Sequence, residues 1–391
     1  MLARRTFEQT HPWITFDLGS SKFGAKTWML LGEASSKAQH IAGVPLAPEI
    51  AKRFYTVFLA KGARATTAIE GNTLTEDQVQ AQVEGTLDLP PSQKYLQQEV
   101  KNIVDACNWL TSDLHQNGVR KITPDFCCEL NRRVLRDLDL PDGISAGEIR
   151  RHSVVVGNVY RGAPAEDCMY LLERLCDSLE TTKAQSKDEA HATAILKALF
   201  AHIYMALIHP FGDGNGRTAR LLEYYVLMEH GFALPTGHLL SNHYNQTRTQ
   251  YYSELDRISK TGGDTHSFVT YALQGFVDGL KEQIATIRKE QLGVTWENFV
   301  HQQFHGKSAP ADARRRELVL RLGSDGETVK ILDLMGLSPR LAKEYAGKTE
   351  KTLIRDLNVL TEMGLITRVQ GRRVMARSER IRAFLPWRAT E

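Results

Sequence analysis

Residues 209–220, His-Pro-Phe-Gly-Asp-Gly-Asn-Gly-Arg-Thr-Ala-Arg, place a potential base, a carboxylate, three glycines and two arginines in one short segment. Glycines let a backbone approach an anion closely, and each arginine can donate paired hydrogen bonds to phosphate oxygens. A histidine beside such a site can accept a proton from an incoming hydroxyl. The segment therefore suits the binding of a polyphosphate that is attacked by a nucleophile.

Two helical patterns flank this segment. Apolar residues recur at helical spacing before it and again after it, and Gly231 is a helix stop. These residues are Ile195, Leu199, Ile203 and Leu207 on the first side and Leu221, Leu222, Tyr225 and Met228 on the second. We therefore expect residues 214–216 to open the second helix, whose N-terminus offers unpaired N–H groups and a positive dipole end to an anion.

The side chains of the segment suggest distinct roles. Arg217 and Arg220 lie three positions apart and share a helix face. Asp213 suits Mg²⁺, which binds one or two carboxylates together with substrate phosphates. His209 and Asp213 could instead be two ligands of a hydrolytic metal, although a second carboxylate is missing, and a lone Gly-Asn-Gly is most often a simple turn.

The segment resembles a known family. It matches, without departure, the Fic signature His-x-Phe-x-(Asp/Glu)-Gly-Asn-Gly-Arg-x-x-Arg. Fic proteins are mostly helical and usually transfer AMP from ATP to a Ser, Thr or Tyr hydroxyl of a target protein. The resemblance implies that His209 is the general base, that Asp213 holds Mg²⁺, that Arg220 holds the γ-phosphate and that Phe211 anchors the loop in the core. It implies nucleotide contacts for Gly212, Asp213, Gly214, Asn215, Gly216, Arg217, Thr218 and Arg220.

A second segment, Thr66 to Gly71, resembles the inhibitory motif of the same family. By itself it is a helix end in which Gly71 is the stop. The resemblance implies that Glu70 pairs with Arg220 in place of the γ-phosphate, so that ATP binds in an unreactive pose. It also implies a possible second role for Glu70, the positioning of a water that removes AMP from the modified target.

Residues 147–164 predict a β-hairpin, since valines and Tyr160 flank Gly157-Asn158. The alternative is a structural loop cover. In Fic proteins a flap at this place pairs with an extended segment of the target, a known mode of recognition, and Gly157 and Asn158 are candidate contacts of the bound nucleotide. Downstream, Arg248-x-x-Tyr-Tyr-x-x-Leu resembles the Fic helix beside the nucleotide, which makes Tyr251 a candidate adenosine contact.

The last part of the chain has a different character. Ser338-Pro339 is typical of a helix start, a second helical pattern ends at Gly364, and residues 365–375 suggest two strands around Gln370-Gly371. This order resembles winged helix-turn-helix regulators. Residues 338–380 carry ten Lys or Arg and five Asp or Glu, a net charge of +5, whereas the whole chain carries +3. We expect DNA contacts from Lys348, Lys351, Arg355, Arg372 and Arg373; the alternative is a protein-binding wing.

The composition is that of an ordinary globular chain, with 42% hydrophobic and 24% charged residues. No continuous run of about 18 apolar residues occurs, so no membrane span is expected, and the first residues lack an apolar signal core. Five cysteines without paired metal spacing suggest reduced thiols in a cytoplasm.

We expect a mainly α protein: a helical Fic core with a small β-hairpin flap, and a small α+β winged-helix domain. The predicted parts are an N-terminal helical region (1–110), the core (111–290), a linker (291–313) and the winged-helix domain (314–391). The predicted function is autoinhibited transfer of AMP from ATP, with Mg²⁺, to a protein target or to the chain itself, and a homodimer is expected. Alternatives are a nucleotide-sensing DNA-binding regulator without transfer activity, and transfer of UMP, phosphate or phosphocholine.

Overall fold

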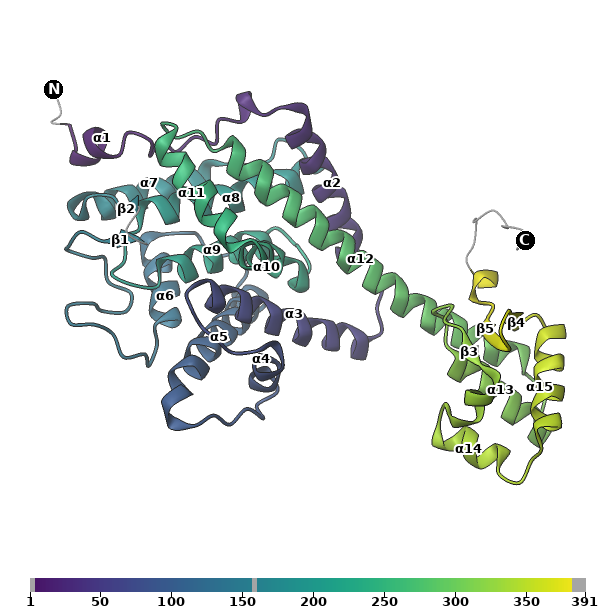
Figure 1. Ribbon diagram of the computed structural model, residues 1–391. Coiled ribbons are helices and arrows are strands. Elements are labelled where there is room, and N and C mark those ends of the chain that lie inside the picture. Colours follow the sequence, from purple (N-terminus) through teal and green to yellow (C-terminus); the bar gives the residue numbers. More distant parts are fainter. Residues whose placement is uncertain (1–3, 157–159, 382–391) are drawn as a thin grey trace. The chain divides into compact units, whose positions relative to one another are not determined.

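A computed structural model describes residues 4–156 and 160–381 of the protein. The chain divides into two compact units, residues 1–284 and 285–391 (Figure 1). It is mainly helical, as expected from the sequence. The helices of the first unit are α1 (Thr6–Thr10), α2 (Ala25–Ala42), α3 (Pro48–Ile69), α4 (Glu76–Val83), α5 (Lys94–Asn117), α6 (Pro124–Val134), α7 (Cys168–Thr181), α8 (Ala190–Ile208), α9 (Asn215–Glu229), α10 (Leu239–Gln246), α11 (Arg248–Lys260) and the first part of α12 (His266–Gln303).

Helices α8 and α9 pack against each other in the middle of the first unit (Figure 1). Both are buried on nearly all faces, because α2 and α7 cover α8 while α3, α5 and α6 cover α9. By length and composition α8 could cross a membrane, yet 72% of its most apolar window is buried inside the unit. It is therefore a central core helix of this unit.

The segment 209–214 joins these two helices, as the sequence predicts. The first helix ends at His209, which has left-handed backbone angles (φ 52°, ψ 58°), and the second begins after Gly214, which is also left-handed (φ 74°). Phe211 is fully buried beneath the loop. The loop thus turns sharply at both ends and places the N-terminus of α9 next to the C-terminus of α8.

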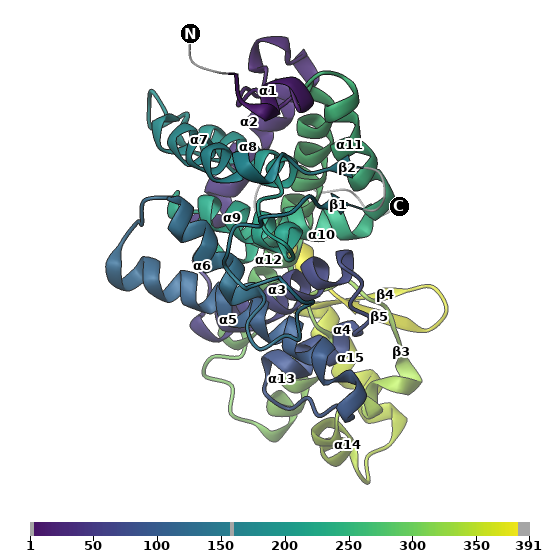
Figure 2. The same cartoon turned by 90° about the vertical axis from the view of Figure 1, so that its left-hand side faces the viewer.

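The predicted hairpin is present on the side of the unit that faces the viewer in Figure 2. Strand β1 (Val155–Val156) pairs antiparallel with β2 (Tyr160–Arg161), with Val156 opposite Tyr160. The residues before and after this flap bind the end of α8 and the loop that follows it. The N–H of Arg150 donates to Pro210 O (3.0 Å), and the N–H of Ala163 donates to Ile208 O (3.2 Å). The predicted contacts Gly157 and Asn158 lie outside the described residues.

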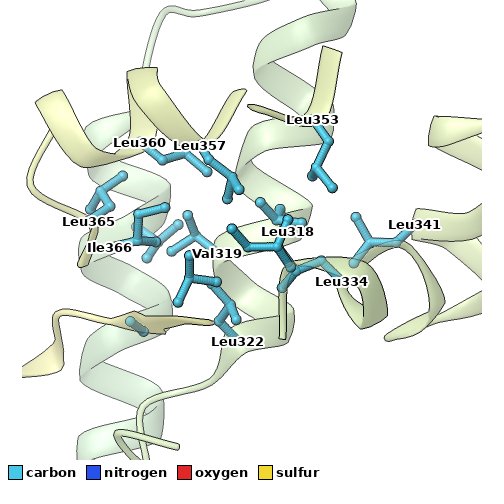
Figure 3. Packing of buried hydrophobic residues seen from close by; sticks show 14 of the residues in the cluster. Leu318, Val319, Leu322, Leu334, Leu341, Leu353, Leu357, Leu360, Leu365 and Ile366 are labelled. Atoms are coloured by element: carbon cyan, nitrogen blue, oxygen red, sulfur yellow. The ribbon is translucent and has the colours of Figure 1, made fainter. Parts of the chain in front are cut away.

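The second unit contains α13 (Pro310–Leu322), β3 (Val329–Lys330), α14 (Pro339–Tyr345), α15 (Glu350–Glu362), β4 (Ile366–Val369) and β5 (Arg373–Ala376). The strands form one antiparallel sheet in the order β3-β5-β4. Leucines and other apolar side chains from all three helices and from the sheet meet in one core (Figure 3). The two helices and the hairpin expected between residues 338 and 376 are therefore present, and β3 adds a third strand that the sequence analysis did not include.

The expected domain boundaries differ from this division. Residue 110 lies inside α5, and all of 1–284 forms one unit. No separate linker occupies 291–313, because α12 continues to Gln303 and α13 begins at Pro310. Trp296 and Val300 in that stretch are buried in the core of the second unit. The polar residues after Val300 suggested a linker, but the apolar side chains at helical spacing determine the fold here.

Candidate active site

A cavity of about 690 Å³ opens at the loop between α8 and α9, a volume suited to a ligand of nucleotide size. The flap strands border the cavity through Val156 and Tyr160, and α11 borders it through residues that include Tyr251. Most of the predicted nucleotide contacts meet here. The lining includes Glu70, His209, Gly212, Asp213, Gly214, Asn215, Gly216, Arg220 and Tyr251.

His209 is held in a defined tautomer. Its Nδ1 lies 3.2 Å from the carbonyl oxygen of Ala206, which can only accept, so Nδ1 carries the hydrogen and neutral Nε2 keeps a lone pair. The pKa of His209 is lowered to about 4, mainly by burial and in part by the Arg150 charge, against the opposing effects of the Ala206 hydrogen bond and the charges of Glu70 and Asp213. The imidazole is therefore neutral at pH 7 and can accept a proton.

Arg220 binds the last turn of α3. Its Nε donates to Thr66 Oγ1 (2.6 Å), and its Nη2 donates to Thr66 O (3.0 Å) and to Glu70 Oε1 (2.6 Å). The third nitrogen, Nη1, is buried and has no hydrogen-bond partner among the described residues. This buried guanidinium thus keeps one nitrogen without a hydrogen bond within the described part of the chain.

Glu70 is the C-terminal cap of α3, and its carboxylate lies over the start of α9. A Cβ placed on Gly216 would come within 2.2 Å of Glu70 Oε1. Burial would raise the pKa of Glu70, but the charge of Arg220 and its hydrogen bond outweigh this and lower it. An ionised carboxylate therefore occupies the place where a helix N-terminus offers its N–H groups to an anion.

Two predicted nucleotide contacts are not part of the cavity lining. Arg217 is buried and donates to Glu99 Oε1 (3.3 Å) and Asp213 Oδ1 (3.4 Å). Thr218 is fully buried, and its hydroxyl accepts a hydrogen bond from Asn131 (3.1 Å). In this conformation both side chains contact residues outside the cavity lining, Glu99 and Asn131.

Asn215 shapes the loop through its side chain. Its Oδ1 accepts from the N–H of Phe211 (2.9 Å) and its Nδ2 donates to the carbonyl of Phe211 (2.8 Å). This two-sided contact fixes the turn that carries Asp213.

Asp213 is the carboxylate of the segment that could hold a metal ion. Its side chain is 45% exposed at the cavity, and no group of three or more metal-binding side chains occurs among the described residues. A single accessible carboxylate beside a phosphate site fits Mg²⁺, which takes its remaining ligands from phosphate and water. It does not fit a hydrolytic metal held wholly by protein side chains.

Tyr251 forms part of the cavity wall and is held from the core side. Its hydroxyl lies 3.0 Å from Nε2 of His202, which is fully buried and stacks near Phe268. Nδ1 of His202 lies 3.4 Å from Glu223, whose other oxygen accepts a hydrogen bond from the hydroxyl of Tyr244 (2.9 Å). Nδ1 of His202 has no hydrogen-bond partner among the described residues, so the Tyr251 ring is held by the contact of its hydroxyl with Nε2 of His202 and by stacking on Tyr244.

Asn131 on α6 is a site residue that sequence reasoning missed. Its Nδ2 donates to the carbonyl of Asp213 (2.9 Å) and to Thr218, and its Oδ1 accepts from the N–H of Gly147 (2.9 Å). It is fully buried and joins the loop to the segment before the flap. Glu99, which pairs with Arg217 and accepts a hydrogen bond from Asn72 (2.8 Å), was missed as well. No spacing in the sequence relates these residues to the loop.

The basic residues predicted for the second unit differ in their surroundings. Lys348, Lys351 and Arg355 are exposed at and along α15. Arg372 is exposed and pairs with Glu350 (2.7 Å), while Arg373 donates to Thr328.

The region that contains the loop resembles known proteins. The Fic/DOC family model matches residues 121–227. Protein adenylyltransferase fic-1 of Caenorhabditis briggsae is 33% identical over 226 residues, covering 57% of this chain and 41% of the relative. Protein adenylyltransferase Fic of Nematostella vectensis is 33% identical over 206 residues, covering 53% and 44%. The match spans less than half of each relative.

Solved structures show a similar fold. A Fic family protein from Desulfovibrio desulfuricans G20 has a similar fold over 94% of this chain and 98% of that chain, with a TM-score of 0.56 and 20% identity. Residues 134–508 of Fic-1 from C. elegans match with a TM-score of 0.53 and 26% identity, over 68% and 73%. The fold and the loop thus define a helical domain built around a glycine-rich turn between α8 and α9. Residues 121–227 of this domain are similar to the Fic/DOC family.

Proposed function

We propose that the protein is an autoinhibited adenylyltransferase that transfers AMP from ATP to a hydroxyl of a protein target. The observation that carries the proposal is the neutral imidazole of His209 at the edge of a cavity that also contains Arg220 and the N-terminus of α9. The names of its relatives, protein adenylyltransferases, support the same chemistry.

In the proposed reaction the target hydroxyl oxygen attacks the α-phosphorus of ATP. The bond from that phosphorus to the oxygen of the departing pyrophosphate breaks, and Nε2 of His209 accepts the hydroxyl proton. Mg²⁺, held by Asp213, would neutralise phosphate charge when bound. The N–H groups at the start of α9 and the free donor of Arg220 would hold phosphate oxygens, and Tyr251 would contact the base. The flap would pair with the target.

Inhibition in this proposal comes from Glu70. Its pairing with Arg220 and its position over Gly216 support competition with the γ-phosphate. The same carboxylate could position a water that removes AMP from a modified target. Release of AMP from a pre-modified target, lost in Glu70→Gly, is the test of that second role.

The test of transfer is the intact mass of purified Glu70→Gly after incubation with ATP and Mg²⁺, with Glu70→Gly/His209→Ala as the control. A gain of one AMP that is absent in the control supports transfer, the base and the inhibitor together. If purified protein gains nothing, incubation in cell lysate with labelled ATP distinguishes an enzyme that needs its target from a sensor. Labelling absent there as well would contradict the proposal.

A second candidate is a DNA-binding regulator, which the exposed basic residues Lys348, Lys351 and Arg355 favour. The helix–turn–helix–hairpin order of the second unit supports a winged-helix assignment. We propose it as an added function of that unit. In the pure sensor form ATP would change DNA affinity without a covalent product. A homodimer and a cytoplasmic location, the latter supported by five free cysteines, complete the proposal; light scattering and cell fractionation test them.

A further inference from the structure

We propose that Arg150 is a positioning residue that couples the flap to the base, so that a displacement of the flap also displaces His209. Arg150 does not belong to the Fic signature and does not line the main cavity. The proposal rests on the proposed function for its meaning in catalysis, but its structural part can be tested separately.

The guanidinium of Arg150 is buried, with 4% of the residue exposed, and its three nitrogens donate to three different segments. Nη1 donates to the carbonyl of His152 before β1 (2.7 Å), Nη2 to the carbonyl of Ala163 after β2, and Nε to the carbonyl of His209 (2.7 Å). One side chain therefore holds both ends of the flap and the residue that carries the base.

These partners are all backbone carbonyls, and no ion pair to a carboxylate is formed by Arg150 within residues 4–156 and 160–381. A buried cation needs such acceptors to offset its desolvation. Nη2 also lies 3.5 Å from the carbonyl oxygen of Ile208. This carbonyl and that of His209 end helix α8, where the helix dipole favours positive charge. The position thus suits an arginine that organises the backbone.

The contact matters because His209 has an unfavourable backbone. A left-handed conformation is unfavourable for a non-glycine residue, and here the carbonyl of that residue is fixed by Arg150. A Cβ on Gly162 would lie 2.9 Å from Cβ of His209 and 3.0 Å from Nη2 of Arg150. The flap, the guanidinium and the base are therefore packed in direct contact, and a shift of one displaces the others.

Lysine cannot replace this group. Its ammonium is a single point donor, whereas the planar guanidinium reaches acceptors in three directions. Arg150→Lys should retain charge and lose at least two of the three backbone contacts. Arg151→Lys, at the exposed neighbouring position, is the matched control.

The first measurement is hydrogen exchange of the full chain. In Arg150→Lys three backbone amides should exchange at least about tenfold faster: that of position 150, that of Ala163 and that of His209. The amides of α3 and α9 should keep their exchange rates. Arg151→Lys should change none of them. Faster exchange of the flap alone, or of neither segment, would overturn the coupling; faster exchange throughout the unit would show a general folding defect and would also count against it.

The second measurement is the rate of AMP incorporation in the Glu70→Gly background. Adding Arg150→Lys should lower that rate at saturating ATP at least tenfold and leave the ATP Kd, from calorimetry with ATP and Mg²⁺, within about twofold. Millimolar guanidinium should restore part of the rate to Arg150→Ala, which a purely structural loss would not permit. Should Glu70→Gly incorporate no AMP even in cell lysate, the proposed function fails, and the exchange data still decide the role of Arg150.

Discussion

Oε1 of Glu70 lies 2.6 Å from Nη2 of Arg220, although 150 positions separate the two residues in the sequence. Arg220 is buried, and the same nitrogen also binds the carbonyl of Thr66. A charge-assisted hydrogen bond of this kind contributes about 1.5–3 kcal/mol. Any phosphate that takes the place of Glu70 must compensate for the loss of this contact.

Glu70→Gly should therefore increase AMP transfer about 10- to 100-fold, the rate equivalent of that contact. Glu70→Gln, which keeps the shape of the side chain but loses its charge, should give a smaller increase. The assay is incorporation of labelled AMP at saturating ATP. Asp77→Asn on exposed α4 is the control. Equal rates for wild type and Glu70→Gly would reject the inhibitory role.

His209→Ala in the Glu70→Gly background should lower transfer by about 10²–10⁴-fold, the range typical of a lost general base. The ATP Kd should change little, because the phosphate donors come from α9 and Arg220. Because the pKa of His209 is lowered to about 4, activity that depends on the neutral imidazole should persist down to pH 5 and fall as the pH passes through about 4. A rate that falls already near pH 6.5 would contradict this assignment.

Asn131→Ala should destabilise the first unit, because it removes two donated hydrogen bonds and leaves the N–H of Gly147 without a partner. We expect the unfolding free energy to fall by about 2 kcal/mol, seen as a lower midpoint in thermal unfolding by circular dichroism. Asn117→Ala is the control, since exposed Asn117 binds Asp113 on the same helix. Unchanged stability in Asn131→Ala would mean that the loop does not depend on this residue.

Stability should decrease with acidity between pH 6.5 and 4. Burial lowers the pKa of His238 to about 4 in the folded chain, so the unfolded chain binds more protons within this window. Each pH unit then costs about 1.4 kcal/mol, or about 3 kcal/mol in total. His238→Phe should remove this one-proton slope, while His115→Phe at an exposed position should retain it. Denaturant unfolding at pH 7, 6, 5 and 4.5 measures the difference.

Lys351→Ala/Arg355→Ala should weaken binding of the full chain to a duplex of about 25 base pairs, which is long enough for one domain. The slope of log affinity against log salt concentration should become smaller by about 2. The measurement is fluorescence anisotropy from 25 to 200 mM salt, with Lys183→Ala/Lys187→Ala of the first unit as the control. Duplex binding that is absent at low salt in the wild type, or equal in both variants, would remove the DNA-binding proposal.

The parts of the site that are local in sequence could be predicted. The loop at 209–216, its two flanking helices, the end of α3 at Glu70 and the hairpin all follow from short patterns. Asn131 and Arg150 could not be predicted, because they contact Asp213 and His209 from 82 and 59 positions away and do so through backbone carbonyls. Such contacts leave no trace in spacing or periodicity.

The linker predicted at 291–313 differs from the structure, in which this stretch is largely helical. Polar composition favoured a break at 291–313, whereas Trp296, Val300 and Phe304 repeat at four-residue spacing and are buried in the second unit. Burial of these three side chains on one helix face determines the structure of this stretch, and its polar composition does not. The placement of Arg217 behind the loop differs for another reason, since its partner Glu99 lies 118 positions away.

The position of Glu70 at the very end of α3 limits how inhibition could be relieved. Further back on the same helix, Gly62 packs so closely that a Cβ there would lie 2.2 Å from Nδ1 of His238, so the helix as a whole is wedged in place. The final turn is closed by the short-range bonds of Glu70 and Gly71 to Thr67 and Ala68, and Arg220 holds it from α9. If Glu70 is the inhibitor, activation needs only the fraying of one helical turn, and any partner that binds this terminus in an uncoiled form would act as an activator.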